Sequence, residues 1–309
     1  MKSNIFCPTC KSINTSYIHK YRGSSIIFHE KILMKCADCE FVFIEPMLSD
    51  IELSKYNSEY FLNAHGGIPS QNIVIAFHSA INIIRSNHIL NSINQPNIKF
   101  RKILEIGPGL GFIMKFFKKK YPDVEYCIIE SDTENLEKLK KLASNYYDDI
   151  DIAPNEYFDL VVISHVLEHT NSPIIFLEKI KSKLKKGGYI FIEVPNEDYK
   201  FKKEDEPHLL FFNHNSFRIL LEKIELNCIK ISYHGPEIKR GYIKNFIIKI
   251  YNFLDHKLSK IGILLPIYIL FPSLRMFLSP REILSIIPFD AIDDKKNPSW
   301  WLRVVAQKT

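Results

Sequence analysis

The chain has 309 residues, of which 46% are apolar and 25% are charged, and its 41 lysine and arginine residues against 35 aspartate and glutamate residues give a net charge of +6. This composition is that of a globular protein and excludes a disordered or collagen-like chain. The positive charge is too dilute to indicate nucleic-acid binding by itself. The N-terminus lacks the apolar core of a secretory signal, and the longest apolar stretch, residues 261–271, is too short to span a bilayer. We therefore expect a cytoplasmic protein without a transmembrane helix.

Two cysteine pairs lie near the N-terminus, in the sequences Cys-Pro-Thr-Cys and Cys-Ala-Asp-Cys, with 25 residues between them. Each pair presents two thiolates from one tight turn, and together they supply the four tetrahedral sulfur ligands that zinc prefers. Four thiolates leave no position for water, so we predict a structural zinc in a ribbon spanning residues 1–45, with a redox dithiol as the alternative. The predicted ligands are Cys7, Cys10, Cys36 and Cys39. Cys228 lies in an apolar stretch and is expected to be buried.

From residue 46 the pattern becomes helical and then alternates. Residues 46–98 are predicted to form a helical connector or cap, whose clearest helix covers residues 71–90. Beyond it, apolar strands at 102–107, 125–130, 158–164 and 188–194 alternate with amphipathic helices at 111–121, 134–146 and 172–184. Strands that are apolar throughout and separated by helices indicate a mostly parallel sheet covered on both faces. We therefore predict a doubly wound α/β core at residues 99–235.

The C-terminal part is predicted to complete this core. A helix at 215–226, a strand at 227–235 and a final strand within 298–309 follow the alternating region. Residues 236–297 are too many for a structureless loop, so we predict a helical insertion before the last strand. Its stretch 240–285 mixes apolar and basic residues, and core packing, a pocket cap, a dimer face and peripheral contact with a membrane-linked substrate are its alternative roles.

A glycine-rich loop joins the first strand of the core to its first helix. Gly107, Gly109 and Gly111 allow the backbone to turn sharply and to approach a ligand at the helix N-terminus. Their spacing is not that of the dinucleotide pattern, since residue 112 is a phenylalanine. Glu105, before the loop, would repel a pyrophosphate but attract an ammonium group. Glu130 ends the next strand and is placed to accept both hydroxyls of a ribose.

S-adenosylmethionine combines an ammonium, a sulfonium and an adenosine ribose. In this loop and the motifs that follow it, the chain resembles the class I S-adenosylmethionine-dependent methyltransferases over residues 102–235. The segment EIGPGLG is similar to the first cofactor motif of this family. The segments FDLVVISHVLEHT and LKKGGYIFIEVPN are similar to its fourth-strand motif and its fifth-strand motif. The cysteine-containing N-terminus followed by SKYNSEYF resembles the zinc-ribbon prefix of methyltransferases that modify sugars and surface glycans. The resemblance implies a Rossmann-like methyltransferase fold that binds the cofactor through Glu105, Gly107, Gly109, Gly111, Glu130, Ser164 and His165.

A histidine-rich turn follows the strand at 158–164. Its sequence His-Val-Leu-Glu-His matches the inverted zinc-protease pattern, but a turn directly after a buried strand favours the ligand-binding edge of a parallel sheet. Methyl transfer to an oxygen also requires loss of a proton, which a histidine accepts near neutral pH. The catalytic candidates are His165, His169 and His208, of which the last lies in a phenylalanine-rich segment that covers the active site in similar enzymes.

These features predict an S-adenosylmethionine-dependent methyltransferase that acts by in-line transfer on a small molecule, of the sugar, nucleotide-sugar or surface-glycan-intermediate type. One alternative is a ribosomal RNA methyltransferase that uses the zinc ribbon for RNA recognition. Residues 1–60 contain only scattered basic side chains, so we do not expect a nucleic-acid partner. The second alternative is a non-catalytic binding module on the same fold, which would not need both acids and all three glycines.

Overall fold

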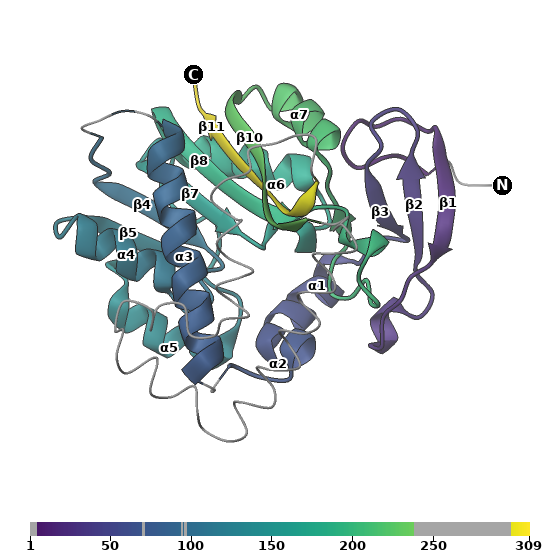
Figure 1. The fold of residues 1–309 in the computed structure, drawn as a ribbon, viewed down its shortest axis with the longest axis horizontal. Coiled ribbons are helices and arrows are strands. Elements are labelled where there is room, and N and C mark those ends of the chain that lie inside the picture. The colour runs from purple at the N-terminus through teal and green to yellow at the C-terminus, as the bar shows by residue number, and fades with distance from the viewer. Residues whose placement is uncertain (1–4, 70–71, 94, 96–97, 238–297) are drawn as a thin grey trace, which may run out of the picture.

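The structure is a computed structural model, and it describes residues 5–69, 72–93, 95, 98–237 and 298–309 (Figure 1). The insertion predicted at 236–297, with its stretch 240–285, lies outside the described residues apart from its first two positions. Within the described part of the chain, the helices are all too short or too polar to cross a membrane.

A mixed sheet, seven-stranded in the described residues, forms the centre of the molecule, in the order β10-β11-β8-β7-β4-β5-β6 (Figure 1). The neighbours from β8 to β6 are parallel, whereas β11 is antiparallel to both β8 and β10. The strands are β4 (Lys102–Ile106), β5 (Glu125–Ile129), β6 (Asn145–Tyr146), β7 (Phe158–Ser164), β8 (Leu184–Pro195), β10 (Asn227–Glu237) and β11 (Ser299–Gln307). The mostly parallel α/β fold predicted from the apolar strands is confirmed.

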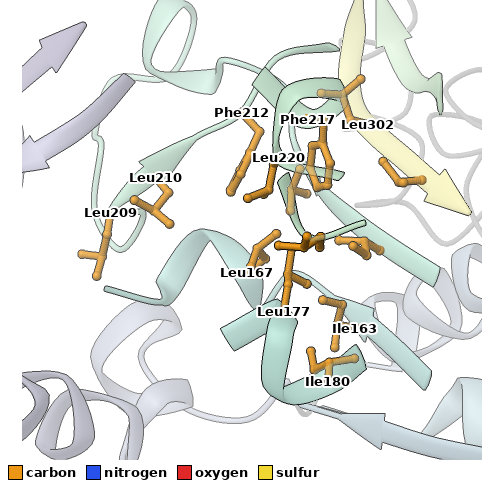
Figure 2. Close-up of a cluster of buried hydrophobic side chains, with 14 of the residues drawn as sticks. Ile163, Leu167, Leu177, Ile180, Leu209, Leu210, Phe212, Phe217, Leu220 and Leu302 are labelled. Atoms are coloured by element: carbon orange, nitrogen blue, oxygen red, sulfur yellow. The ribbon is translucent and has the colours of Figure 1, made fainter. Parts of the chain in front are cut away.

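Helices cover both faces of this sheet because successive residues of a strand point to opposite sides. Ile103 packs in one core cluster with Phe117, and Leu104 packs in the other with Leu177. The first cluster lies under α3 (Asn72–Ile93), α4 (Phe112–Lys120) and α5 (Thr133–Leu142), and the second under α6 (Pro173–Lys183) and α7 (His214–Lys223). Figure 2 shows the second cluster, where side chains of α6 and α7 meet Ile163 and Leu302.

A smaller antiparallel sheet contains the N-terminal strands, in the order β1-β2-β3-β9 (Figure 1). Its strands are β1 (Thr15–Lys20), β2 (Ile32–Cys36), β3 (Val42–Glu45) and β9 (Leu210–Phe211). The last strand comes from a distant part of the chain, so that Val42 pairs with Phe211 and Phe43 with Leu210. The N-terminal sheet is therefore joined to the segment that directly follows His208.

Two short helices connect the N-terminal sheet to the core. The first, α1 (Asp50–Asn57), begins with a capping box in which the Ser49 hydroxyl accepts from the backbone of Glu52 and the Glu52 carboxylate accepts from the backbone of Ser49. The second, α2 (Tyr60–His65), is held by its Phe61 N–H, which donates to the Asp132 carboxylate at 2.8 Å. Because Asp132 also caps α5, this bond fixes α2 next to the carboxyl edge of the large sheet.

Candidate active site

The glycine loop between β4 and α4 has a left-handed backbone at each of its glycines. The φ angles are 65° at Gly107, 54° at Gly109 and 70° at Gly111, a region that costs other residues about 1–2 kcal/mol. The three positions differ in their surroundings. A Cβ on Gly107 would lie 2.6 Å from Val166, whereas a Cβ on Gly109 would meet only Phe61, at 3.9 Å. Gly107 thus permits close packing, and Gly109 leaves space for a ligand.

This difference predicts distinct effects for two matched substitutions. Gly107→Ala is expected to destabilise the fold more than Gly109→Ala, because only the first adds a clash to the backbone strain. Gly109→Ala is expected to weaken S-adenosylhomocysteine binding by about tenfold or more, since its methyl group projects into the open space. Thermal unfolding and calorimetric titration of both variants measure this contrast. Equal melting temperatures for the two would contradict the packing role of Gly107.

Glu130 follows β5 and lies against the glycine loop, as its place in the sequence predicted. One carboxylate oxygen accepts from the Gly109 N–H at 3.4 Å and the other from the Asp132 N–H at 3.0 Å. Asn135 supports the same loop by donating to the Gly109 carbonyl at 2.6 Å. Burial raises the pKa of Glu130. A carboxyl acceptor is therefore fixed beside the loop by the Gly109 and Asp132 N–H groups.

Glu105 is a buried acid on the strand that leads into the loop. Its carboxylate accepts from the Tyr126 hydroxyl at 2.7 Å and is 3% exposed. Burial raises the pKa of Glu105 to about 8. A cationic ligand group next to Glu105 would favour the ionised form, so the site suits an ammonium group.

The raised pKa of Glu105 predicts a pH dependence of stability. The folded state holds a proton on this carboxyl that the unfolded state loses above about pH 4.5, so stability falls as the pH rises from about 4.5 towards 8. We expect wild type to lose up to about 1.4 kcal/mol per pH unit relative to Glu105→Gln within that window. Denaturant unfolding of the ligand-free proteins between pH 5 and 8 measures this, with Glu134→Gln as an exposed control. Parallel curves for wild type and Glu105→Gln would contradict it.

His165 follows β7 in a left-handed conformation, with φ 57°. Its Nδ1 lies 3.1 Å from Glu168 and its Nε2 lies 3.1 Å from Glu193. Burial opposes a charge on this ring, but the hydrogen bonds to Glu168 and Glu193 outweigh it and raise the pKa of His165. A ring that donates hydrogen bonds from both nitrogens has no lone pair left, so it cannot accept a proton from a substrate while these bonds hold. The geometry therefore favours a positioning role for His165.

A buried ion-pair network holds Glu193, which sequence patterns did not single out. Arg85 on α3 donates to one carboxylate oxygen at 2.6 Å, and Arg303 on β11 donates to the other. Burial disfavours ionisation of Glu193, but the two guanidinium groups hold its pKa well below the usual range. Breaking such a buried pair from one side leaves an uncompensated charge. Glu193 is thus a fixed anion that orients His165.

His169 and His208 lie together at one end of the site, with ring centroids 5.1 Å apart. His208 Nδ1 lies 2.8 Å from the Asp198 carboxylate. His169 Nε2 lies 3.3 Å from the Tyr60 hydroxyl, and burial lowers the pKa of His169 to about 4, so this ring is neutral at pH 7. Asp198 and Tyr60 were not predicted, because their contacts depend on distant segments of the chain.

One cavity of ≈ 1270 Å³ unites these groups. It runs from the glycine loop and Glu130, past the end of β7, to α1, α2, α3 and the start of β11. Of the predicted cofactor and catalytic residues, those that line it are Glu105, Gly107, Gly109, Glu130, Ser164, His165, His169 and His208. Gly111 is not among its lining residues and instead precedes α4 as the N-cap. Within the described structure the Ser164 hydroxyl is buried without a hydrogen-bond partner. This orphaned group and the space at Gly109 fit the predicted cofactor.

The four N-terminal cysteines form a separate cluster. Cys7 and Cys39 have their sulfurs 3.5 Å apart, those of Cys10 and Cys36 are 3.4 Å apart, and all four lie within 4.8 Å of one another. This set fits tetrahedral zinc. Cys228 was expected to be buried and is exposed, which corrects that prediction. It lies on β10 at the edge of the sheet, where one side of the strand has no neighbouring strand in the described structure.

Comparisons with known proteins give a family match. A family model described as a methyltransferase domain matches residues 84–231, and no curated protein sequence matches the chain. A SAM-dependent methyltransferase structure from Archaeoglobus fulgidus is 16% identical, with a TM-score of 0.44 over 73% of this chain and 93% of that chain. The plantazolicin methyltransferase BpumL, in complex with SAH, is 15% identical, with a TM-score of 0.48 over 84% of this chain and 96% of that chain. The 1,6-didemethyltoxoflavin-N1-methyltransferase of Burkholderia thailandensis is 12% identical, with a TM-score of 0.46 over 92% of this chain and 98% of that chain.

Proposed function

Because residues 84–231 form a methyltransferase domain of the class I S-adenosylmethionine-dependent type, we propose that the protein methylates a hydroxylated small molecule of the sugar, nucleotide-sugar or surface-glycan-intermediate type. The observation that supports this proposal is that the cofactor-binding acids and an aromatic, histidine-containing end share one cavity. Such a shared cavity lets the acceptor atom be aligned with a bound methyl group, which is the main requirement of an in-line displacement.

The cofactor end of the cavity is formed by the glycine loop and its acids. When bound, S-adenosylmethionine supplies a methyl group on a positively charged sulfur, which is a good leaving group. Glu130 would accept the ribose hydroxyls, and Glu105 would face the ammonium group. The Ser164 hydroxyl would gain the partner that it lacks in the described structure. These residues bind and orient the cofactor without taking part in bond making.

The acceptor end carries aromatic side chains that suit a sugar. Trp300 stacks on Phe201 with ring centroids 5.7 Å apart and an interplanar angle of 16°, and both rings line the cavity. Trp301 lies beside them in the lining, under the guanidinium of Arg85. Aromatic faces pack against the apolar C–H faces of sugar rings, while nearby polar groups set orientation. Trp300 is 41% exposed, so its face is accessible at the rim of the cavity.

The cluster of Glu168, His169 and His208 would activate the acceptor oxygen. Its two histidines line the cavity, and all three side chains are buried. An acceptor hydroxyl becomes a better nucleophile as its proton leaves, and a positioned group that assists this typically contributes 10²–10⁴-fold to the rate. The cluster therefore brings a carboxylate and two imidazoles together at the cavity.

We further propose that the four-cysteine cluster holds a structural zinc. The N-terminal sheet includes β9, so the metal would stabilise the sheet that contains the segment directly after His208. Removal of zinc with a strong chelator, or Cys36→Ser, is expected to lower the melting temperature by several degrees, since structural zinc contributes directly to folding. Elemental analysis and thermal unfolding measure this, with Cys228→Ser as the matched control. An unchanged melting temperature after complete zinc removal would overturn the proposal.

Incubation of the full chain with isotope-labelled S-adenosylmethionine and separate pools of nucleotide-sugars, glycan lipids and RNA tests the acceptor class. Mass spectrometry of each pool is expected to show a methyl mass gain on a sugar-containing molecule. A gain on RNA alone would replace the proposal by the ribosomal RNA alternative. Binding of S-adenosylhomocysteine without transfer to any pool would favour a non-catalytic module.

A further inference from the structure

Three metal-ligating side chains converge at the acceptor end of the cavity. Glu168 and His169 lie in the 3₁₀ turn Leu167–His169 after β7, and His208 lies 39 residues further along the chain. A backbone hydrogen bond of 2.9 Å from the Leu209 N–H to the Glu168 carbonyl brings the two segments together. One ligand atom from each of the three side chains lies within 4.8 Å of the others, and all three residues are buried.

Both histidines are held by a hydrogen bond at Nδ1. His169 Nδ1 lies 3.2 Å from the Pro207 carbonyl, which can only accept a hydrogen bond, so Nδ1 carries the proton. His208 Nδ1 lies 2.8 Å from the Asp198 carboxylate, which accepts a hydrogen bond, so Nδ1 is the donating nitrogen. In the neutral rings, each Nε2 therefore carries a lone pair. This is the arrangement of metal-ligating histidines, whose other nitrogen donates to a carbonyl or carboxylate.

The carboxylate between them is incompletely satisfied. Glu168 Oε1 accepts from His165, but Oε2 is buried and has no hydrogen-bond partner in the described structure. A buried carboxylate oxygen without a partner is costly, so an unoccupied acceptor here indicates a missing cation or proton.

We propose that Glu168, His169 and His208 bind a divalent transition-metal ion, such as zinc, iron(II) or cobalt(II). Two imidazoles and one carboxylate form a ligand set that such ions accept, with metal–ligand distances of about 2.0–2.2 Å and at least one position left open. Both histidines line the cavity, so the open position faces the acceptor. The Tyr60 hydroxyl, now 3.3 Å from His169 Nε2, would move from that lone pair to the edge of the coordination sphere.

This site deepens the proposed function and, in its chemical role, rests on it. An acceptor hydroxyl bound to the ion would lose its proton to water at a lower pH than in solution. The resulting oxygen would form a bond to the methyl carbon, while the carbon–sulfur bond breaks and its electron pair stays on sulfur. Metal binding itself requires only the three ligands, so it can be measured without the acceptor.

The test is the metal content of the full chain, loaded with one equivalent of zinc for the four-cysteine cluster, after titration with cobalt(II) chloride. Calorimetry and elemental analysis are expected to show one cobalt bound per chain in addition to one zinc. Glu168→Gln and His208→Gln are expected to weaken cobalt binding at least about 100-fold, and Asp198→Asn about 10–100-fold. His29→Gln, which changes an exposed histidine of the N-terminal region, serves as the control and is expected to bind both metals.

Zinc content and S-adenosylhomocysteine affinity show whether each variant is folded. If a variant fails to fold, wild-type protein still provides a test, because bound cobalt shifts the ring proton resonances of His169 and His208. Absence of a second metal in wild type, or a second metal that persists in both ligand variants, would overturn the proposal. Loss of methyl transfer to every acceptor, with cobalt still bound at these ligands, would overturn the proposed function and leave the metal site intact.

Discussion

Replacement of His208 by asparagine is expected to lower kcat for methyl transfer by about 100-fold or more. The ring lies at the acceptor end of the cavity, with its Nδ1 held by Asp198. Asparagine retains a polar group of smaller size but has no imidazole nitrogen lone pair to contribute to the cluster. Because the cofactor residues are at the other end of the cavity, the affinity for S-adenosylhomocysteine should change less than about threefold.

Steady-state kinetics with the acceptor found by mass spectrometry, together with calorimetry, measure these two quantities. His214→Asn is the matched control, since His214 begins α7 and is not among the residues that line the cavity. A His208→Asn variant with wild-type kcat would remove this residue from the catalytic candidates. A parallel loss of cofactor affinity and stability would assign it a structural role instead.

Replacement of Glu130 by alanine is expected to weaken cofactor binding by about 100-fold. The carboxylate is half-buried beside the glycine loop, and hydrogen bonds from two hydroxyls to a charged acceptor are worth about 1.5–3 kcal/mol each. Loss of the hydrogen bonds from the Gly109 and Asp132 N–H groups adds a further cost. The effect should fall on S-adenosylmethionine and S-adenosylhomocysteine alike, since both carry the ribose.

Calorimetric titration with S-adenosylhomocysteine measures this loss, and the exposed Glu137→Ala on α5 is the control. Glu130→Gln should recover only part of the affinity, because a neutral amide accepts weaker hydrogen bonds than a carboxylate. If Glu130→Ala binds the nucleoside as tightly as wild type, the ribose contact lies elsewhere and the proposed orientation of the cofactor is wrong.

The elements of the core could be predicted because their signals are local. Strands such as β7 are mostly apolar runs. The helix α7 begins after Asn213, whose capping box is a local signal of a helix N-terminus. The glycine loop was equally local, since one strand, three glycines and one helix follow each other directly. The short β6, with two residues, gave almost no pattern, and the helix predicted at 134–146 wrongly included it, because α5 ends at Leu142.

The surroundings of the catalytic candidates were beyond sequence patterns because they depend on long-range contacts. Glu193 is embedded in an otherwise apolar strand, and its partners Arg85 and Arg303 are more than 100 residues away in either direction. Tyr60 reaches His169 from a helix that is 109 residues earlier in the chain. Periodicity and spacing describe neighbours in sequence, so they identified His169 but could not identify the groups that set its proton affinity.

The bond between α2 and the start of α5 has a consequence for the order of binding. Glu130 accepts from the Asp132 backbone, the Asp132 carboxylate accepts from Phe61, and the adjacent Tyr60 contacts His169. One wall of the proposed acceptor compartment is thus built on the residues that we propose receive the nucleoside. Entry of the nucleoside would complete that wall before the second substrate arrives, so turnover should follow a compulsory sequence in which the methyl donor enters first and the demethylated nucleoside departs last.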